Sequence, residues 1–443
     1  MFERFRRCLQ AVSNNHELSM GYLSQQALKN LKKYSYKGVD ESLVSHYVLT
    51  PYWNWFIKLF PLTIAPNTIT LLGLCIVVFN VVTLLYYDPL YLTEKDGATG
   101  PPQWIYFTWA IGLFMYQSFD AVDGKQARRT GMAGPLGEMF DHGCDALNTT
   151  LEVVLASRAL NLGRSWWTVA SQIATLANFY LTTWEEYHTG VLYLGPFSGP
   201  VEGILMIVII YIISGIFGPT FWDKKILTVT RLDRIPQVVQ HIPNIGLNES
   251  FMVFGAFALA FNIVSSYRNV IKATKADGKS SLKPLIYLLP FVVSATLQIF
   301  WLLSPSYHDS AIIHSPLFLP FLCAWGLQFA HQVGRMILSH VTRGPFPLWH
   351  NMWLWSVVGV VDAQLPFLFD KPSFIQSTPK RTAMFIYLTL AISCITYARF
   401  CALVIRDITE FLGIACFTVR KKDAEGVWRE TRDIQQDGYV KRL

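Results

Sequence analysis

The sequence predicts an all-α, polytopic integral membrane protein with about ten transmembrane helices and an N-terminal amphipathic helix at the membrane surface. Apolar residues make up 52% of the 443 residues and charged residues only 15%, whereas soluble chains carry roughly 25% charge. Long apolar runs recur along the chain, and about 20 such residues cross a bilayer as a helix. Because the runs are continuous and do not alternate, they favour helices over barrel strands. This composition excludes a secreted globular protein, a nucleic-acid-binding module and a disordered chain, so no nucleic-acid partner is expected.

The two ends of the chain are predicted to lie in the cytosol. Residues 1–66 form a cytosolic or interfacial segment whose start is basic but lacks the apolar core of roughly 7–15 residues that a cleavable signal peptide needs. Farther along this segment, lysines alternate irregularly with aromatic residues, a pattern typical of a helix on a membrane surface; a soluble lead-in is the alternative. Residues 406–443 are predicted to form a charged, partly disordered tail.

Ten apolar runs between these ends are predicted to span the membrane. They cover residues 68–88, 103–125, 135–160, 166–188, 199–219, 250–272, 283–303, 311–335, 347–370 and 381–405. The connections and tails on the side of the N-terminus contain 26 Lys and Arg residues, and the connections on the other side contain 9. Since basic residues concentrate on the cytosolic side of membrane proteins, both termini are expected there.

Four aspartates lie at the cytosolic ends of the second and third spans. They are Asp120, Asp123, Asp141 and Asp145 in the stretch FDAVDGKQARRTGMAGPLGEMFDHGCD. Because burying an unpaired carboxylate is costly, a partner is required. A divalent cation such as Mg²⁺, Mn²⁺ or Ca²⁺ suits oxygen ligands. The structural alternative is ion pairing with Lys125, Arg128 and Arg129 at the membrane surface.

Helical spacing allows the four aspartates to converge on one site. Asp120, Asp123, Gly124, Ala127 and Arg128 fall on one face of the second span, and Gly137, Asp141 and Asp145 on one face of the third. The turn RRTGMAGP brings the two faces together. The small residues leave room for a flat ligand, and the Arg128 guanidinium suits a phosphate. The pattern predicts phosphoryl transfer, for which two metals about 3.5–4 Å apart can clamp the attacking and leaving oxygens. We therefore expect residues 67–220 to form the catalytic region and residues 221–405 the remaining spans.

These eight positions resemble the signature of the CDP-alcohol phosphotransferases, D-x2-D-G-x2-A-R-x8-G-x3-D-x3-D, without a departure. The segments APNTITLLG (65–73), FDHGCD (140–145), TWEEYHTG (183–190) and GPVEG (199–203) are similar to the eukaryotic cholinephosphotransferase and ethanolaminephosphotransferase branch. The resemblance covers most of the chain and weakens in both tails.

The resemblance implies an activity and a set of ligands. Phosphocholine or phosphoethanolamine would pass from CDP-choline or CDP-ethanolamine to diacylglycerol, giving phosphatidylcholine or phosphatidylethanolamine and CMP. The four aspartates would hold two Mg²⁺ or Mn²⁺ ions, Gly124 and Ala127 would flank the cytidine, and Arg128 and Asn67 would contact the phosphates. A homodimer in the endoplasmic reticulum membrane, with the Golgi as the alternative location, is also implied. The choice between choline and ethanolamine stays open.

The lipid hydroxyl needs a general base, and two residues are candidates. His142 follows the third aspartate, and an imidazole titrates near neutral pH. Across the wider family this position is often not histidine, and the last aspartate, here Asp145, has been given the role. We favour His142 and keep Asp145 as the rival.

Other polar residues near the membrane surface have less specific interpretations. Glu185, Glu186 and His188 end the fourth span, where they could line the donor entrance or form an interfacial cap. Glu202 begins the fifth span and is expected to support the site residues without binding substrate. Asp362 lies deep in the ninth span, and the sequence indicates no partner for it.

Two other function classes fit part of this pattern. A cation- or proton-coupled transporter also needs carboxylates inside the membrane. It would place them near the midplane, often on broken helices, and it has no need of the Gly124, Ala127 and Arg128 stripe. A nonenzymatic lipid-binding scaffold would not need all four aspartates. The transferase is therefore the favoured prediction, with the transporter as the alternative.

Overall fold

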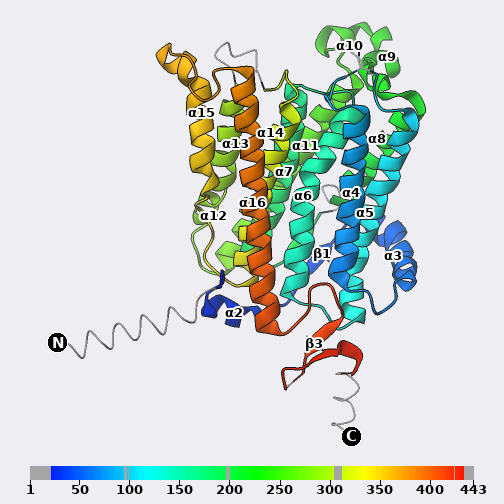
Figure 1. The fold of residues 1–443 in the computed structure, drawn as a ribbon. Helices are drawn as coiled ribbons and strands as arrows, with labels where there is room; N and C mark the ends of the chain where they lie inside the picture. The colour runs from blue at the N-terminus through cyan, green and yellow to red at the C-terminus, as the bar shows by residue number, and fades with distance from the viewer. Residues whose placement is uncertain are drawn as a thin grey trace, which may run out of the picture.

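The computed structural model describes residues 21–93, 97, 99–195, 200–303, 312–423 and 425–433. Three features of the sequence analysis lie outside the described residues. They are the start of the chain, where no signal peptide is predicted, Gly199 of the GPVEG segment, and the end of the tail (434–443). Most residues of the described part are helical, and the strands are short (Figure 1).

Each predicted span overlaps a long helix or, in one case, a broken helix, although α14 begins and ends six to seven residues later than the predicted span 311–335. These helices run alongside one another in Figure 1. They are α4 (Pro66–Tyr87), α5 (Gln103–Arg129), α6 (Pro135–Ala159), α7 (Trp166–Thr189), α8 (Pro200–Phe217), α11 (Leu247–Ala276), α12 and α13 (Lys283–Ile286 and Leu289–Leu302), α14 (Phe318–Val341), α15 (Met352–Phe369) and α16 (Pro379–Leu412). The prediction of an all-α architecture is confirmed.

Hydropathy separates these helices into two groups. Helices α4, α11, α15, α16 and the α12–α13 stretch Lys283–Leu302 are long and apolar enough to cross a membrane. Most of the α11 surface is left uncovered, and Phe254, Phe257 and Phe261 expose 55%, 73% and 56% of their side chains. Helices α5 and α6 carry the acidic motif, which lowers their hydropathy. The polytopic architecture therefore stands, while the count of ten crossings stays a prediction.

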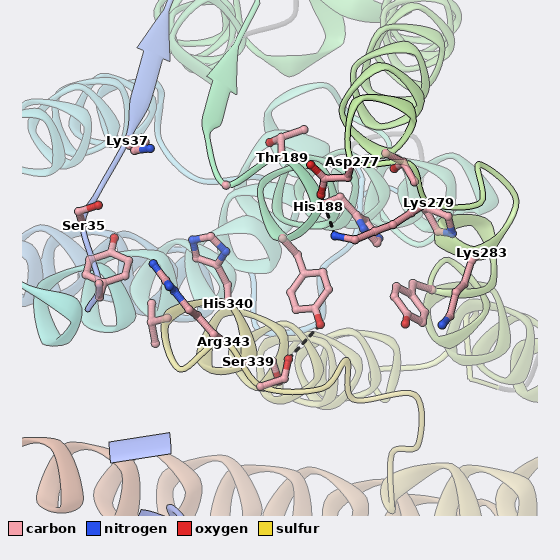
Figure 2. A pocket seen from close by; sticks show the side chains of 18 of the residues that line it. Ser35, Lys37, His188, Thr189, Asp277, Lys279, Lys283, Ser339, His340 and Arg343 are labelled. Carbon is pink, nitrogen blue, oxygen red and sulfur yellow. Dashed lines mark hydrogen bonds and ion pairs between the residues drawn. The ribbon is translucent and has the colours of Figure 1, made fainter. Parts of the chain in front are cut away.

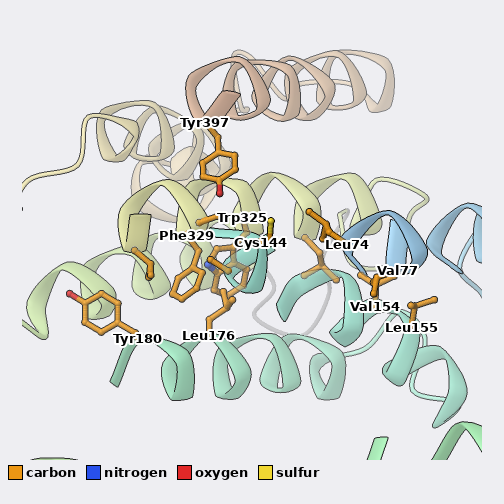
Figure 3. Close-up of a cluster of buried hydrophobic side chains, with 14 of the residues drawn as sticks. Leu74, Val77, Cys144, Val154, Leu155, Leu176, Tyr180, Trp325, Phe329 and Tyr397 are labelled. Atoms are coloured by element: carbon orange, nitrogen blue, oxygen red, sulfur yellow. The ribbon is translucent and has the colours of Figure 1, made fainter. Parts of the chain in front are cut away.

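The hydrophobic core is centred on α14, which packs against α6, α7 and α16. Trp325 and Phe329 of α14 meet Leu176 and Tyr180 of α7 in a cluster of buried side chains (Figure 3). Helix α5 packs on α4 and α8 at the other side of α6. The helices that carry the aspartates are thus held by neighbours along much of their length.

Short elements gather at the two ends of the bundle (Figure 1). At the end where α5 stops and α6 starts lie α2 (Gln25–Leu31), β1 (Gly38–Asp40), η1 (Ser45–Leu49), α3 (Thr50–Phe56), η2 (Ile57–Leu59), β2 (Leu192–Leu194), β3 (Arg420–Lys422) and β4 (Trp428–Glu430). The opposite end carries η4 (Pro219–Asp223), α9 (Ile226–Val229), η5 (Leu232–Arg234) and α10 (Pro236–His241).

The predicted interfacial helix is divided into two short helices, α2 and α3. Between α2 and η1 the chain includes the short strand β1, which pairs in parallel with β2 so that Gly38 lies opposite Leu192. Around α3, Tyr47, Trp55 and Leu59 expose 72%, 56% and 60% of their side chains. This outward aromatic and apolar surface is what a segment lying on a membrane requires.

Candidate active site

The α5–α6 hairpin carries the four predicted aspartates. Helix α5 ends at Arg129, and α6 begins at Pro135. Between them Gly131 has φ +67°, a left-handed conformation that glycine adopts without a steric penalty. Proline in the first turn of a helix loses no hydrogen bond, because that N–H has no partner within the helix. The local sequence therefore reverses the chain and sets the two acidic faces against each other.

The four carboxylates converge. Oxygen atoms of Asp120, Asp141 and Asp145 all lie within 4.8 Å of one another. Asp123 is 7% exposed and lies close enough to Asp141 and Asp145 to interact electrostatically with both. Two helices therefore bring four acids into one small volume, as the spacing predicts.

This set of donors fits a divalent cation. Asp141 Oδ1 is buried and has no hydrogen-bond partner in the described part of the chain. None of the ion pairs among the described residues joins a Lys or Arg to these carboxylates. Lys125 donates instead to Asn54 Oδ1 at 2.9 Å, and Arg129 to the carbonyl of Ile57 at 2.6 Å. Surface ion pairing thus does not account for the cluster, and carboxylate oxygens suit Mg²⁺ or Mn²⁺.

Open space lies beside the aspartates. A Cβ added at Gly124 would meet only Arg128 Nη1, at 3.9 Å, and a Cβ at Gly137 would have no atom within 4 Å. Ala127 is buried, whereas Arg128 is exposed beyond it. The room for a flat ligand that the small residues predict is therefore present on both helices, and a guanidinium stands at its edge.

Two hydroxyl groups that the sequence did not single out fix the aspartates. Thr70 of α4 donates a hydrogen bond to Asp123, and Tyr116 of α5 donates to Asp145 Oδ1 at 2.5 Å. Tyr116 stands one helical turn before Asp120, a spacing that could have identified it. Thr70 lies on a separate helix, so only its position three residues after Asn67 hints at a role.

The C-terminal segment contacts the same region. Asn67, which is predicted to contact phosphates, donates its amide to the carbonyl of Cys416 at 3.1 Å. Lys421 of β3 donates to the carbonyl of Gly131, and Thr431 donates to the carbonyl of Thr130 at 2.8 Å. Burial lowers the pKa of Lys421. The described residues of the segment 413–433 therefore fold back as a clasp on the α5–α6 loop. The phosphate contact of Asn67 stays a prediction.

A second group of titratable side chains adjoins the aspartates on α6. Ligand atoms of Glu138, His142 and Glu186 lie within 4.8 Å of one another. His142 Nδ1 is 4.0 Å from Glu186 Oε2, and Glu138 Oε1 is 3.9 Å from His340 Nε2. Both carboxylate oxygens of Glu138 lack a hydrogen-bond partner in the described part. The structure thus directs His142 towards α7, and it adds Glu138, four residues earlier on the same face, which sequence reasoning missed.

Tyr36, just before β1, extends the site from the N-terminal segment. Its phenol interacts electrostatically with Glu186, Asp141 and Asp120, and with Arg128. Burial, followed by these carboxylates, raises the pKa of Tyr36 to about 12, against the opposing effect of Arg128. The side chain is 54% exposed, so the phenol lies close to these groups at the protein surface. Tyr36 therefore lies near the acidic site, at its exposed edge.

Comparison with known proteins places this chain in a family. Residues 63–230 match the family model described as CDP-alcohol phosphatidyltransferase. An uncharacterized class-I member of that family from Schizosaccharomyces pombe is 41% identical over 90% of this chain and 98% of its own. The chain belongs to the CDP-alcohol phosphatidyltransferase family. Cholinephosphotransferase 1 of Saccharomyces cerevisiae is 38% identical over 90% of this chain and 98% of its own. Choline/ethanolaminephosphotransferase 1 of Arabidopsis thaliana is 35% identical over 91% and 100%.

The predicted resemblance is confirmed, and this CDP-alcohol phosphatidyltransferase is an enzyme rather than a transporter or a scaffold.

The two consecutive acids at the end of α7 take different positions. Glu186 faces His142, whereas Glu185 accepts a hydrogen bond from Asn269 of α11 at 2.7 Å. Neighbouring residues on a helix point about 100° apart. Glu185 therefore joins two helices, and of the two only Glu186 adjoins the site.

The remaining predicted residues lie in separate environments. His188 stacks on Tyr287, with ring centroids 5.3 Å apart. Glu202 accepts a hydrogen bond from the hydroxyl of Ser42 in the N-terminal segment. Neither contact is with an aspartate of the motif, and a supporting role for Glu202 stays a prediction.

Asp362 of this transferase has a structural partner that the sequence did not indicate. Its carboxylate accepts hydrogen bonds from the backbone N–H groups of Phe374, Ile375 and Gln376 at 2.8, 2.7 and 2.8 Å. Asp362 therefore fixes the loop between α15 and α16 at the end of the bundle away from the acidic motif (Figure 1).

Proposed function

We propose that this transferase moves phosphocholine, phosphoethanolamine or both from the CDP-alcohol to diacylglycerol. The products would be phosphatidylcholine or phosphatidylethanolamine and CMP. The convergence of four aspartates on two helices beside open space is the observation that carries the proposal. The names of the Saccharomyces and Arabidopsis relatives support the choice of headgroup.

The four aspartates are the proposed ligands for two Mg²⁺ or Mn²⁺ ions. When bound, such ions neutralise charge on the diphosphate and stabilise the leaving group. The protein's part is to hold the carboxylates in place: Thr70 and Tyr116 each bind one of them by a hydrogen bond. Gly124 and Ala127 would flank the cytidine, and the exposed guanidinium of Arg128 would hold a phosphate as a planar donor.

His142 is the proposed general base, with Glu186 as the group that orients it. Glu186 lies on the Nδ1 side of the imidazole at 4.0 Å, which leaves Nε2 for the hydroxyl proton of diacylglycerol. The deprotonated oxygen would attack the phosphorus that carries the alcohol headgroup, the bond from that phosphorus to the CMP oxygen would break, and CMP would leave. Asp145, the rival base, already accepts a hydrogen bond from Tyr116.

The setting of the enzyme is proposed from the sequence and the resemblance. The excess of basic residues on one side supports an active site that opens to the cytosol. The endoplasmic reticulum membrane, with the Golgi as the alternative, and a homodimer rest on the resemblance.

A two-donor competition tests the proposed function. Purified protein in nanodiscs with diacylglycerol and Mg²⁺ receives CDP-[¹⁴C]choline and CDP-[³H]ethanolamine together. We expect at least one labelled phospholipid and an equal amount of CMP, and the ratio of labels gives the preference. Asp141→Asn is the inactive control. A wild-type preparation that is folded yet forms neither phospholipid would overturn the proposal.

A further inference from the structure

A second cavity lies near the C-terminal end of α7, and Figure 2 shows side chains that line it. It is a cavity of about 570 Å³ between the segment before β1, the end of α7, the α11–α12 connection and the end of α14. None of the four aspartates lines it. The cavity is therefore separate from the four aspartates, although His340 in its lining lies 3.9 Å from Glu138 of the adjoining group.

The cavity is basic. Lys37, Lys279, Lys283 and Arg343 line it, and Asp277 is its one acid. Asp277 is already paired with Lys279, at 2.7 Å. Lys37, Lys283 and Arg343 form no ion pair with another residue of the described ranges. Four cations and one acid leave an excess of three positive charges in the lining, which favours an anion with more than one charge.

One wall of the cavity holds a fixed hydrogen-bonding group. His188 stacks on Tyr287 with an interplanar angle of 12°, and Tyr287 stacks on Phe346 with centroids 4.3 Å apart. His188 Nε2 is buried, and no group of the described part binds it. The stack thus orients an unpartnered nitrogen within the lining of a cationic cavity.

The same cavity borders an apolar surface. Lys283, Pro284 and Tyr287 of the α12 region line the cavity. Between and beside them Leu282, Ile286 and Leu289 are apolar and expose 71%, 49% and 53% of their side chains. A short helix with one cationic and one apolar side, leading directly into α13, is suited to the headgroup level of a bilayer.

We infer that this cavity binds the phosphate headgroup of an anionic membrane phospholipid, at a site distinct from the catalytic one. A phosphomonoester carries about −1.5 to −2 charge at neutral pH, which matches the excess of cations. Arg and Lys are the side chains that bind phosphate oxygens. Soluble phosphates share this chemistry, but the apolar row of Leu282, Ile286 and Leu289 gives acyl chains a surface that a soluble anion does not use.

Retention of phosphatidic acid tests the inference without any transfer reaction. Wild-type protein is reconstituted in phosphatidylcholine nanodiscs with a small fraction of ³²P-phosphatidic acid, re-extracted in mild detergent and affinity-purified, and the bound label is counted. We expect the double variant Lys283→Gln, Arg343→Gln to retain about tenfold less label, since two charge-assisted contacts are lost. The charge-conserving double variant Lys283→Arg, Arg343→Lys keeps most of it and shows that loss does not follow from misfolding.

Matched controls separate the site from general surface charge and from soluble anions. Lys272 and Lys275 are exposed on α11 and do not line the cavity, so Lys272→Gln, Lys275→Gln should retain label as the wild type does. Equal losses in the two Gln double variants, or no retention by the wild type, overturn the inference. Displacement of the label by millimolar inorganic phosphate or CMP assigns the cavity to soluble phosphates and overturns the lipid assignment. No CDP-alcohol is present, so the result is independent of the proposed function.

Discussion

At the scale of single residues, hydrogen bonding distinguishes the four aspartates. Asp123 and Asp145 each accept a hydroxyl hydrogen bond, from Thr70 and Tyr116, whereas Asp141 Oδ1 has no partner in the described part. A buried carboxylate oxygen without a donor is costly unless a cation binds it. This contrast supports the prediction that Asp141 is a metal ligand, and it makes Tyr116 a candidate for orienting Asp145.

Removing the Tyr116 hydroxyl should weaken metal binding and leave the ligands in place. Residues that orient metal ligands typically contribute about 10–100-fold to the affinity for the metal. We expect Tyr116→Phe to raise the Mg²⁺ concentration for half-maximal transfer by that factor, with near-normal turnover at saturating Mg²⁺. Tyr86→Phe, on a residue that is 78% exposed, is the matched control. EDTA should abolish transfer in all variants, and full activity in the chelator would contradict metal dependence.

The two candidate bases are separable by kinetics. General-base catalysis is worth about 10²–10⁴-fold in rate, so His142→Ala should lower turnover by that factor with little change in CDP-alcohol affinity. Asp145→Asn should instead weaken metal and donor binding, because it removes a converging carboxylate. Single-turnover rates and donor binding by titration distinguish the outcomes. Near-normal turnover in His142→Ala, or parallel loss of rate and affinity, would assign the base to Asp145.

At the scale of elements, site residues at helical spacing on one helix could be predicted from the sequence. Site residues brought in by tertiary contacts from other elements could not. The motif faces of α5 and α6 follow from helical periodicity, so the convergence of the aspartates was foreseeable. Glu138 and Tyr116 lay on these same faces and could have been found. Thr70 and Tyr36 come from other elements, and no local pattern places them at the site.

The interfacial segment shows the same limit. Its composition predicts a surface helix, and α3 presents the expected aromatic exterior. The break at β1 could not be predicted, because β1 is only three residues long and its partner β2 lies more than 150 residues later in the chain. This pairing holds the segment that carries Tyr36 near the acidic site.

The environment of Tyr36 predicts a pH dependence of stability. An unfolded tyrosine titrates near pH 10, whereas in the folded protein burial raises the pKa of Tyr36 to about 12. The unfolded chain therefore loses this proton first, and the folded state loses stability as pH rises from about 10 towards 12. Thermal unfolding between pH 8 and 11 should show a steeper fall in Tm for the wild type than for Tyr36→Phe. A Tyr47→Phe control should follow the wild type, and identical slopes for all three would refute this account.

At the scale of the whole molecule, composition and charge distribution established the class of protein before any contact was known. The apolar content required a membrane, and the motif identified the family that the comparisons confirmed. Hydropathy alone could not count the crossings, since the catalytic helices carry their charges inside the bundle. The charged residues that a catalytic helix carries for its site thus lower the hydropathy by which a membrane span is recognised.

Sidedness is the prediction that belongs to the whole molecule. Basic residues are concentrated on the side of the N-terminus, 26 against 9, which predicts that the site opens to the cytosol. Sealed microsomes should therefore use added CDP-choline or CDP-ethanolamine without detergent. The same vesicles treated with a membrane-impermeant protease should lose the C-terminal epitope. Activity that emerges only after the vesicles are opened would place the site on the other side.

The contact between the clasp and the α5–α6 loop has a consequence for the order of events during synthesis of the chain. Lys421 holds Gly131 across 290 residues of chain. At roughly 5–20 residues per second, a ribosome needs about 15–60 s to make that length. For most of that period the hairpin with the four aspartates is already synthesised, but its loop still lacks the hydrogen bond from Lys421. The contact that holds the α5–α6 loop can thus form only after every helix from α7 to α16 has been made.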